Sequence, residues 1–423
     1  DFLTRALIDR LKQFQYPYVL VATDPDEAVR LHDEGMSVIA GDLDDPETYE
    51  RARVDNASLV VSTNSDQVST NVAATVRSIA EDVDIVAIAD TPASVDILEL
   101  AGCTQVLQLA DMLGESLARR ISAGDAMAHV LGEFDELLIA EATVKHTPLA
   151  GKTLAEAALR TNTGVSVVGV WERGSYQAAR PETMIADRTV LVLAGTQEQL
   201  HKYDSLLVGF NQSVDPVIII GAGRVGLATA RSLERRGVDY RIVEQDESRD
   251  TGDGKFVAGS AAALEVLQEA GIDTAPAVVI TTRDDDTNIY LAIYCRKLQP
   301  DIQVIARAND ERNISTLHRA GTDFVMSYAS MGASAIANML HHTSTLMVAE
   351  GLELFRLQVP DALAGQSIAE SSLRAQTGCT VVASCVGDGI TVNPDPTAPL
   401  TRDTEIILIG TAEGERKFLE LYS

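Results

Sequence analysis

The chain has 423 residues, of which 46% are hydrophobic, so it is long enough for several domains with their own cores. No apolar run reaches the roughly 20 residues that a membrane-spanning helix needs, and we expect a soluble chain without a signal peptide. The formal net charge of −28 argues against a nucleic-acid-binding protein, because phosphate contacts require a basic surface. Four cysteines without C-x-x-C spacing predict a reducing compartment and no structural zinc.

The first segment, residues 1–125, alternates strand-like and helix-like stretches. Strand patterns cover Val60–Thr63 and Ile85–Asp90, and a helical pattern follows each of them. Such alternation predicts parallel βαβ units with helices on both faces of the sheet. We therefore assign these residues to a Rossmann-like lobe.

Residues 126–205 predict a smaller α+β lobe, because one short helical pattern is combined with several strand patterns. Its sequence marks are Leu149-Ala-Gly-Lys-Thr-Leu-Ala-Glu156, the pair Leu159-Arg160 and the pair Thr163-Gly164. The polar residues of 206–215, just before Pro216, predict a linker.

Residues 216–340 predict a second Rossmann-like lobe that carries a dinucleotide-binding motif. An apolar strand leads into Gly221, Gly223 and Gly226, a helical run follows, and a second strand ends at Glu244. The first glycine permits a tight turn, the second lets the backbone approach a pyrophosphate, and the third lets helix and strand pack closely. A glycine turn without a ligand is the competing interpretation, which the complete strand–turn–helix–strand context disfavours.

The residues next to these glycines are candidate ligand contacts. The N–H groups of Arg224 and Val225 open the helix and are expected to face the pyrophosphate. Glu244 is expected to accept hydrogen bonds from ribose hydroxyls, which favours NAD or another adenine nucleotide over 2′-phosphorylated ligands. Gln245 faces either the ribose or solvent.

Other candidates follow the later strands of this lobe, where ligands bind in such folds. Turn chemistry and β-propensity explain several of them equally well. Arg307, at the end of an apolar strand, is expected to meet a phosphate, a carboxylate or a partner subunit. The candidates are Gly259, Ser260, Ala261, Thr281, Thr282, Asn288 and Arg307.

Three consecutive acids, Asp284, Asp285 and Asp286, stand at a predicted helix start. Our preferred interpretation is N-capping and complementation of the helix dipole. The alternative is a divalent-cation site, for example for Ca²⁺, because hard cations bind clustered oxygens.

Residues 341–423 predict a second small α+β lobe, and they reveal that the chain is duplicated. Leu363-Ala-Gly-Gln-Ser-Ile-Ala-Glu370 and Leu373-Arg374 repeat the marks of residues 126–205, while Asn71 is aligned with Asn288 between the larger lobes. The predicted fold class is α/β, with two doubly wound Rossmann-like lobes, each followed by a small α+β lobe.

The two Rossmann-like lobes are not equivalent. Aligning their first helices sets Asp1 opposite Gly223, Thr4 opposite Gly226, and Ala22 opposite Glu244. We therefore expect the given sequence to begin inside a phosphate loop, without the first strand and without the ribose-binding acid. The first lobe is interpreted as a degenerate site and the second as the intact one.

The two small-lobe signatures, together with the motifs Gly221-x-Gly223-x-x-Gly226, Glu244, Asn288 and Arg307, resemble tandem RCK (regulator of potassium conductance) domains. The resemblance implies a cytosolic gating-ring subunit of a ligand-gated potassium channel, at the cytoplasmic face of the cell membrane. It also implies a pore-forming membrane domain, upstream or in a separate subunit, and a homotetramer that forms a ring of eight domains. The nucleotide is then a regulatory ligand.

Two alternatives remain open. Regulatory subunits of Trk-type potassium transporters are similar to the same pattern, but the degenerate first lobe favours a channel. An NAD-dependent oxidoreductase needs a proton donor or acceptor near the nicotinamide. His146 and Lys152 in the first small lobe have no counterparts at Pro360 and Gln366 in the second. We therefore expect no enzymatic activity.

Overall fold

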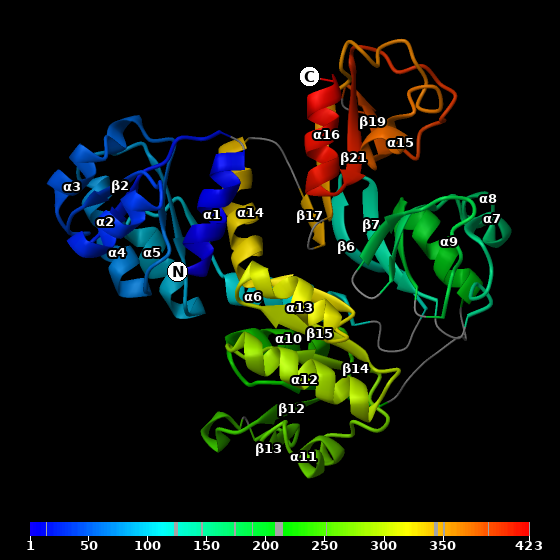
Figure 1. Cartoon of the computed structure of the whole chain (residues 1–423), viewed down its shortest axis with the longest axis horizontal. Coiled ribbons are helices and arrows are strands. Elements are labelled where there is room, and N and C mark those ends of the chain that lie inside the picture. Colours follow the sequence, from blue (N-terminus) through cyan, green and yellow to red (C-terminus); the bar gives the residue numbers. More distant parts are fainter. Residues whose placement is uncertain are drawn as a thin grey trace. The chain divides into compact units, whose positions relative to one another are not determined.

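The computed structural model describes the chain except residues 14, 122–125, 145–146, 173–174, 188, 208–214, 251, 342–345, 350–351, 388 and 423. The chain divides into two compact units (Figure 1). The first contains residues 1–112 and 328–342, and the second contains residues 113–327 and 343–423. None of the described helices is both long and apolar enough to span a membrane.

The first unit contains a parallel sheet in two parts. Strand β1 pairs with β2, and β3–β4–β5 form a separate three-stranded sheet. Its elements are α1 (Phe2–Gln13), β1 (Leu20–Ala22), α2 (Pro25–Asp33), β2 (Val38–Ala40), α3 (Pro46–Arg51), η1 (Val54–Asn56), β3 (Leu59–Ser62), α4 (Asp66–Arg77), β4 (Asp84–Ile88), η2 (Pro92–Ser94), α5 (Val95–Leu100), β5 (Gln105–Leu107) and α14 (Tyr328–His341).

The second Rossmann-like lobe has one continuous parallel sheet, in the order β13-β12-β11-β14-β15-β16. Its strands are apolar on both faces, as a sheet covered on both sides requires. The elements are β11 (Val217–Ile220), α10 (Arg224–Arg235), β12 (Tyr240–Glu244), η3 (Glu247–Arg249), β13 (Phe256–Ala258), α11 (Leu264–Glu269), β14 (Ala277–Ile280), α12 (Asp285–Leu298), β15 (Gln303–Ala308), η4 (Glu311–Asn313), α13 (Ile314–Arg319) and β16 (Phe324–Ser327).

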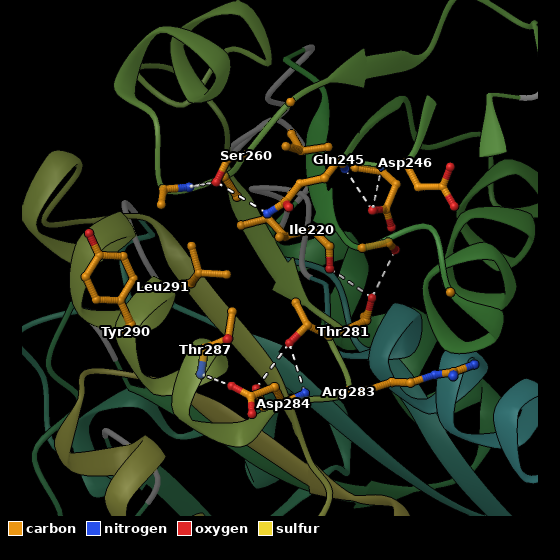
Figure 2. Close-up of a pocket in the computed structure, with 18 of the residues that line it drawn as sticks. Ile220, Gln245, Asp246, Ser260, Thr281, Arg283, Asp284, Thr287, Tyr290 and Leu291 are labelled. Atoms are coloured by element: carbon orange, nitrogen blue, oxygen red, sulfur yellow. Dashed lines mark hydrogen bonds between the residues drawn. The ribbon is translucent and has the colours of Figure 1, made fainter. Parts of the chain in front are cut away.

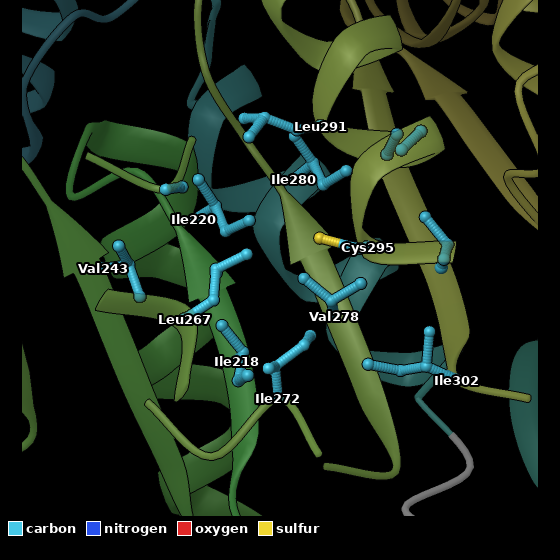
Figure 3. Close-up of a cluster of buried hydrophobic side chains, with 14 of the residues drawn as sticks. Ile218, Ile220, Val243, Leu267, Ile272, Val278, Ile280, Leu291, Cys295 and Ile302 are labelled. Atoms are coloured by element: carbon cyan, nitrogen blue, oxygen red, sulfur yellow. The ribbon is translucent and has the colours of Figure 1, made fainter. Parts of the chain in front are cut away.

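The core of this lobe lies between the sheet and its helices. Figure 3 shows Ile218, Ile220 and Val278 of the strands near Leu291 and Cys295 of α12. Cys295 is fully buried, and burial raises the pKa of its thiol to about 12. This cysteine is therefore a small apolar core residue at neutral pH.

Each small lobe is a five-stranded antiparallel sheet with short helices. The orders, β6-β7-β10-β8-β9 and β17-β18-β21-β19-β20, are the same. The first comprises β6 (His129–Phe134), β7 (Leu137–Thr143), α7 (Leu154–Ala157), α8 (Leu159–Thr163), β8 (Ser166–Glu172), β9 (Ser175–Ala178), β10 (Val190–Gly195) and α9 (Gln197–Leu207). The second comprises β17 (Leu346–Ala349), β18 (Leu352–Gln358), α15 (Leu373–Thr377), β19 (Thr380–Val386), β20 (Gly389–Val392), β21 (Thr404–Gly410) and α16 (Ala412–Tyr422). The predicted fold class is confirmed.

Two helices do not stay within the lobes to which the predicted boundaries assign them. Helix α14, which we predicted within 216–340, packs on α1 in the first unit, where Ile336 shares a cluster with Leu3 and Leu7. Helix α6 (Leu109–Arg119) begins in the first unit and continues in the second, where Gly114 lies so close to α10 that a Cβ would stand 2.4 Å from the Cβ of Ala228. The predicted linker 206–215 starts within α9, and residues 208–214 lie outside the described part.

The structure also corrects the alignment of the two Rossmann-like lobes. Arg77 and Arg296 each donate to the carbonyl of the glycine before the last strand, at 2.6 and 2.7 Å. Asp66 and Asp285 each accept the N–H that follows the neighbouring strand. This register sets Ser69, not Asn71, opposite Asn288.

The side chain of Arg120 connects the first small lobe with the second Rossmann-like lobe, through a buried ion pair to Glu141 and a contact with Phe324. Nη1 of Arg120 lies 3.3 Å from Oε1 of Glu141, and the two side chains are 3% and 5% exposed. The Arg120 guanidinium lies over the ring of Phe324, 5.1 Å from its centroid, and Trp171 meets the same ring edge-on. Burial raises the pKa of Glu141, although Arg120, His129 and Trp171 oppose that shift.

We predict that Arg120→Ala lowers the free energy of unfolding by about 3–5 kcal/mol, because Glu141 is left buried without its cation. The change is measured by urea unfolding, with Trp171, the single tryptophan of the chain, as the fluorescent reporter. Arg402→Ala is the matched control, since its pair with Asp361 is 73% and 82% exposed and solvent screens it. Equal losses in the two variants would contradict the prediction.

Candidate functional site

A pocket of about 680 Å³ opens at the carboxyl ends of β11, β12, β13 and β14. This is the edge at which open parallel sheets bind ligands. Its wall is formed by Ile220, Gly221, Gly223, Val243, Glu244, Gln245, Asp246, Arg249, Gly259, Ser260, Ala261, Ala262, Thr281, Thr282, Arg283, Asp284, Asp286, Thr287, Tyr290 and Leu291.

The glycine loop has the geometry that its sequence predicts. Gly221 has φ +104°, a conformation that favours glycine. A Cβ on Gly226 would stand 1.9 Å from the carbonyl oxygen of Gly221, so the third glycine is needed for packing within the protein. A Cβ on Gly223, which caps α10, would meet no atom within 4 Å. The protein itself leaves the space at Gly223 open to a ligand.

Glu244 ends β12 inside the pocket and is held by the backbone. Its Oε2 accepts the N–H of Ala222 at 2.8 Å, and its Oε1 accepts those of Gln245 at 2.7 Å and Asp246 at 3.2 Å. Partial burial alone raises the pKa of this carboxyl, but the three N–H groups and Arg249 together lower it below its ordinary value. A fixed, charged acceptor therefore faces the pocket.

Arg249 is a wall residue that the sequence interpretation missed. Its Nη1 donates to the carbonyl of Ala222 at 3.0 Å, and its Nε donates to Oδ2 of Asp246 at 3.2 Å. The side chain thus ties the glycine loop to the turn after β12. Its only sequence signal is an arginine shortly after the ribose acid, which is too common a pattern to single it out.

The threonines after β14 have mainly structural partners. Oγ1 of Thr281 donates to the carbonyls of Ile220 at 2.9 Å or Gly221 at 3.2 Å. Thr282 donates to Oδ1 of Asn288 at 2.6 Å, and Nδ2 of Asn288 donates to the carbonyl of Arg307 at 3.0 Å. Asn288 is fully buried, so it braces the strand ends behind the pocket instead of lining it.

The predicted candidates fall into two groups. Nine lie in the pocket wall: Gly221, Gly223, Glu244, Gln245, Gly259, Ser260, Ala261, Thr281 and Thr282. Five lie outside it: Arg224, Val225, Gly226, Asn288 and Arg307. Val225 and Asn288 are buried. Arg224 and Val225 still supply the first N–H groups of α10, next to the open space at Gly223.

The three acids Asp284, Asp285 and Asp286 have different roles in the structure. Asp284 is the N-cap of α12 and accepts the N–H of Thr287 at 2.7 Å, which confirms the capping interpretation for this residue. Asp285 accepts hydrogen bonds from Asn309, Asp310 and Asn313, so both of its oxygens are engaged. The described residues contain no group of three potential metal ligands. Asp286, the third acid, lies in the pocket wall.

Helix α12 supplies a side of the pocket that the sequence interpretation did not anticipate. Figure 2 shows Tyr290, Leu291 and Thr287 along one side, Gln245 and Asp246 on the other, and Ser260 between them. None of the three α12 residues belongs to the glycine motif, so local spacing gave no reason to choose them. They line the pocket because the fold places the first turns of α12 beside it.

Comparison with protein families identifies the two kinds of lobe. Residues 3–109 and 217–328 match the TrkA-N domain, and residues 139–208 and 352–423 match the TrkA-C domain. The chain belongs to this family and carries two RCK domains in tandem. The resemblance inferred from the motifs is thereby confirmed.

Solved structures of high similarity are RCK proteins. The GsuK RCK domain is 38% identical, with a TM-score of 0.69, over 99% of this chain and 92% of that one. The GsuK channel bound to NAD is 39% identical, also with a TM-score of 0.69, over 99% of this chain and 77% of that one.

Among curated relatives, potassium channel protein 1 of Methanocaldococcus jannaschii is 24% identical over 46% of this chain and 63% of that protein. The Trk system potassium uptake protein TrkA homolog of Pyrococcus abyssi is 32% identical over 37% of this chain and 76% of that protein. The chain thus spans less than two thirds of the channel protein.

We predict that Gly226→Ala lowers the thermal stability of the second lobe, because the new methyl group collides with the Gly221 carbonyl. Overpacking of this kind costs about 1–3 kcal/mol or more. Gly223→Ala is the control, since its methyl group enters open space and the melting temperature should be kept. The packing role of Gly226 is refuted if the two variants melt at the same temperature.

Proposed function

We propose that this chain is the ligand-sensing part of a gating ring that regulates potassium flux through a membrane pore. Its signal is NAD or another adenine nucleotide, bound in the second Rossmann-like lobe. The observation that carries the proposal is the complete site at Gly221, Gly223 and Glu244 in a chain with tandem RCK domains. The NAD-bound channel, at 39% identity, supports the same ligand class.

The pocket's polarity favours a dinucleotide without a 2′-phosphate. Glu244 presents a fixed negative charge where the ribose is expected, and Asp246 stands beside it. A carboxylate accepts hydrogen bonds from ribose hydroxyls but repels a phosphate at the same place. The open space at Gly223, at the N-terminus of α10, suits the pyrophosphate.

A regulatory role is supported over hydride transfer by the composition of the pocket wall. The described lining residues include no histidine, lysine or cysteine, and hydrogen bonds lower the pKa of the Glu244, Asp246 and Asp284 carboxyls, which makes them poor proton donors and weak bases. A hydride-transfer enzyme needs a proton donor or acceptor next to the nicotinamide. We therefore propose that the bound nucleotide is a signal and is not consumed.

The proposed partners are a pore-forming membrane domain and further copies of this chain, in a tetrameric ring of eight domains at the cytoplasmic face of the membrane. Nucleotide acts on the pore only by its different affinities for two states of the ring. A regulatory subunit of a Trk-type transporter is the second candidate, favoured by the 32% identity with a TrkA homolog.

We predict that Glu244→Gln weakens NAD binding by about tenfold or more, because hydrogen bonds to a charged acceptor contribute about 1.5–3 kcal/mol. The same change narrows the preference for NAD over NADP, since the repelling charge is removed. Isothermal titration calorimetry with both ligands measures the two effects. Glu247→Gln, at an acid on η3 outside the pocket wall, is the control. Unchanged NAD affinity in Glu244→Gln would refute the assigned role.

A second prediction tests the phosphate position. Gly223→Ala should leave the fold intact but weaken NAD binding by more than about tenfold, because the methyl group fills the approach of the pyrophosphate. Binding is measured by the same titration and the fold by thermal unfolding. Turnover of NADH with any small substrate would contradict the signalling role.

A further inference from the structure

Tyr290 is the most exposed large apolar side chain of the pocket wall. It lies in the second turn of α12 and is 54% exposed, whereas its neighbour Leu291 is buried in the core behind the pocket. The ring of Tyr294, one turn further on, stacks on it with centroids 6.0 Å apart and an angle of 27° between the planes. Tyr290 is thus held by a neighbour on its own helix while part of its surface stays open.

The duplicated lobe provides an internal comparison. The register that sets Asp66 opposite Asp285 and Arg77 opposite Arg296 sets Asn71 opposite Tyr290. The lobe with Glu244 therefore carries a tyrosine where the lobe with Ala22 carries an asparagine. The aromatic residue is thus present in the lobe that has the ribose acid, which is the pattern expected of a residue that contacts the ligand.

The neighbouring wall is built from small residues. The turn after β13 contains Gly259, Ser260 and Ala261, and all three line the pocket. Oγ of Ser260 receives a hydrogen bond of 3.4 Å from Nε2 of Gln245, which follows the ribose acid. Small side chains here leave room for a flat ring, and Figure 2 shows Ser260 between Tyr290 and Gln245.

We propose that Tyr290 is the stacking platform for the base of the bound nucleotide and makes this site select purines over pyrimidines. The inference rests on the proposed nucleotide site and deepens it. With the ribose held at Glu244, the attached base extends along the wall that Ser260 and Tyr290 share. A purine has a larger π-surface than a pyrimidine, so it gains more from an aromatic face.

The experiment is calorimetric titration of the whole chain with AMP and with UMP. Tyr290→Ala should weaken AMP binding by about tenfold, the effect of losing one base-stacking contact. UMP binding should weaken less, so the ratio of the two affinities falls. Tyr290→Phe should keep the AMP affinity within about twofold, because the aromatic face remains.

Ile293→Ala is the matched control, since Ile293 lies on the same helix, is equally exposed at 54%, and is absent from the pocket wall. It should leave AMP affinity unchanged. Tyr290→Asn, which installs the residue of the first lobe, serves as a second truncation if Tyr290→Ala melts below the parent.

The outcomes separate this inference from the proposed function. If the parent chain binds neither AMP nor NAD, the nucleotide site itself is wrong. If the parent binds AMP, Glu244→Gln weakens it, and Tyr290→Ala or Tyr290→Asn does not, the site stands and the platform is refuted. If the ratio of the AMP affinity to the UMP affinity is unchanged in these variants, the proposed stacking role of Tyr290 is also refuted.

Discussion

The pairing of β11 within the sheet is the constraint on which the second lobe depends. β11 is bonded to β12 on one side and to β14 on the other, and the N–H of Gly221 continues the ladder to the carbonyl of Val243 at 2.9 Å. On the other side, the N–H of Thr281 donates to the carbonyl of Ile220 at 2.9 Å. The glycine loop is therefore anchored on both flanks, and the ribose acid and the threonines reach the same edge of the sheet.

The described part of the first lobe is arranged differently. By the shared register, β1 and β3 correspond to β12 and β14, and the described residues place no strand between them. The sheet is accordingly in two parts. Ala22 also stands at the end of β1 where Glu244 ends β12, so the end of this strand carries no charged acceptor.

The sequence predicted those features that depend on local spacing. Gly221, Gly223 and Glu244 are recognisable because the turn, the helix start and the strand end stand at fixed distances along the chain. Asn288 lies behind the pocket wall, since a polar residue at a strand end serves equally well to brace the backbone or to meet a ligand. Arg307 also lies outside the wall, and its contact with a phosphate, a carboxylate or a partner subunit stays a prediction. Tyr290 and Arg249 were missed because their places in the wall depend on the path of α12 and of the turn after β12.

Helix α14 has a consequence for how the protein is made. Leu3 and Leu7 of α1 find Ile336 only after the whole of residues 113–327 has been synthesised. Contacts so distant along the chain slow folding, and domains otherwise tend to fold in the order of synthesis. The first unit therefore emerges from the ribosome with an apolar helix face uncovered, and it completes its core after the second Rossmann-like lobe has left the ribosome. The lobe with the nucleotide site has the earlier opportunity to fold.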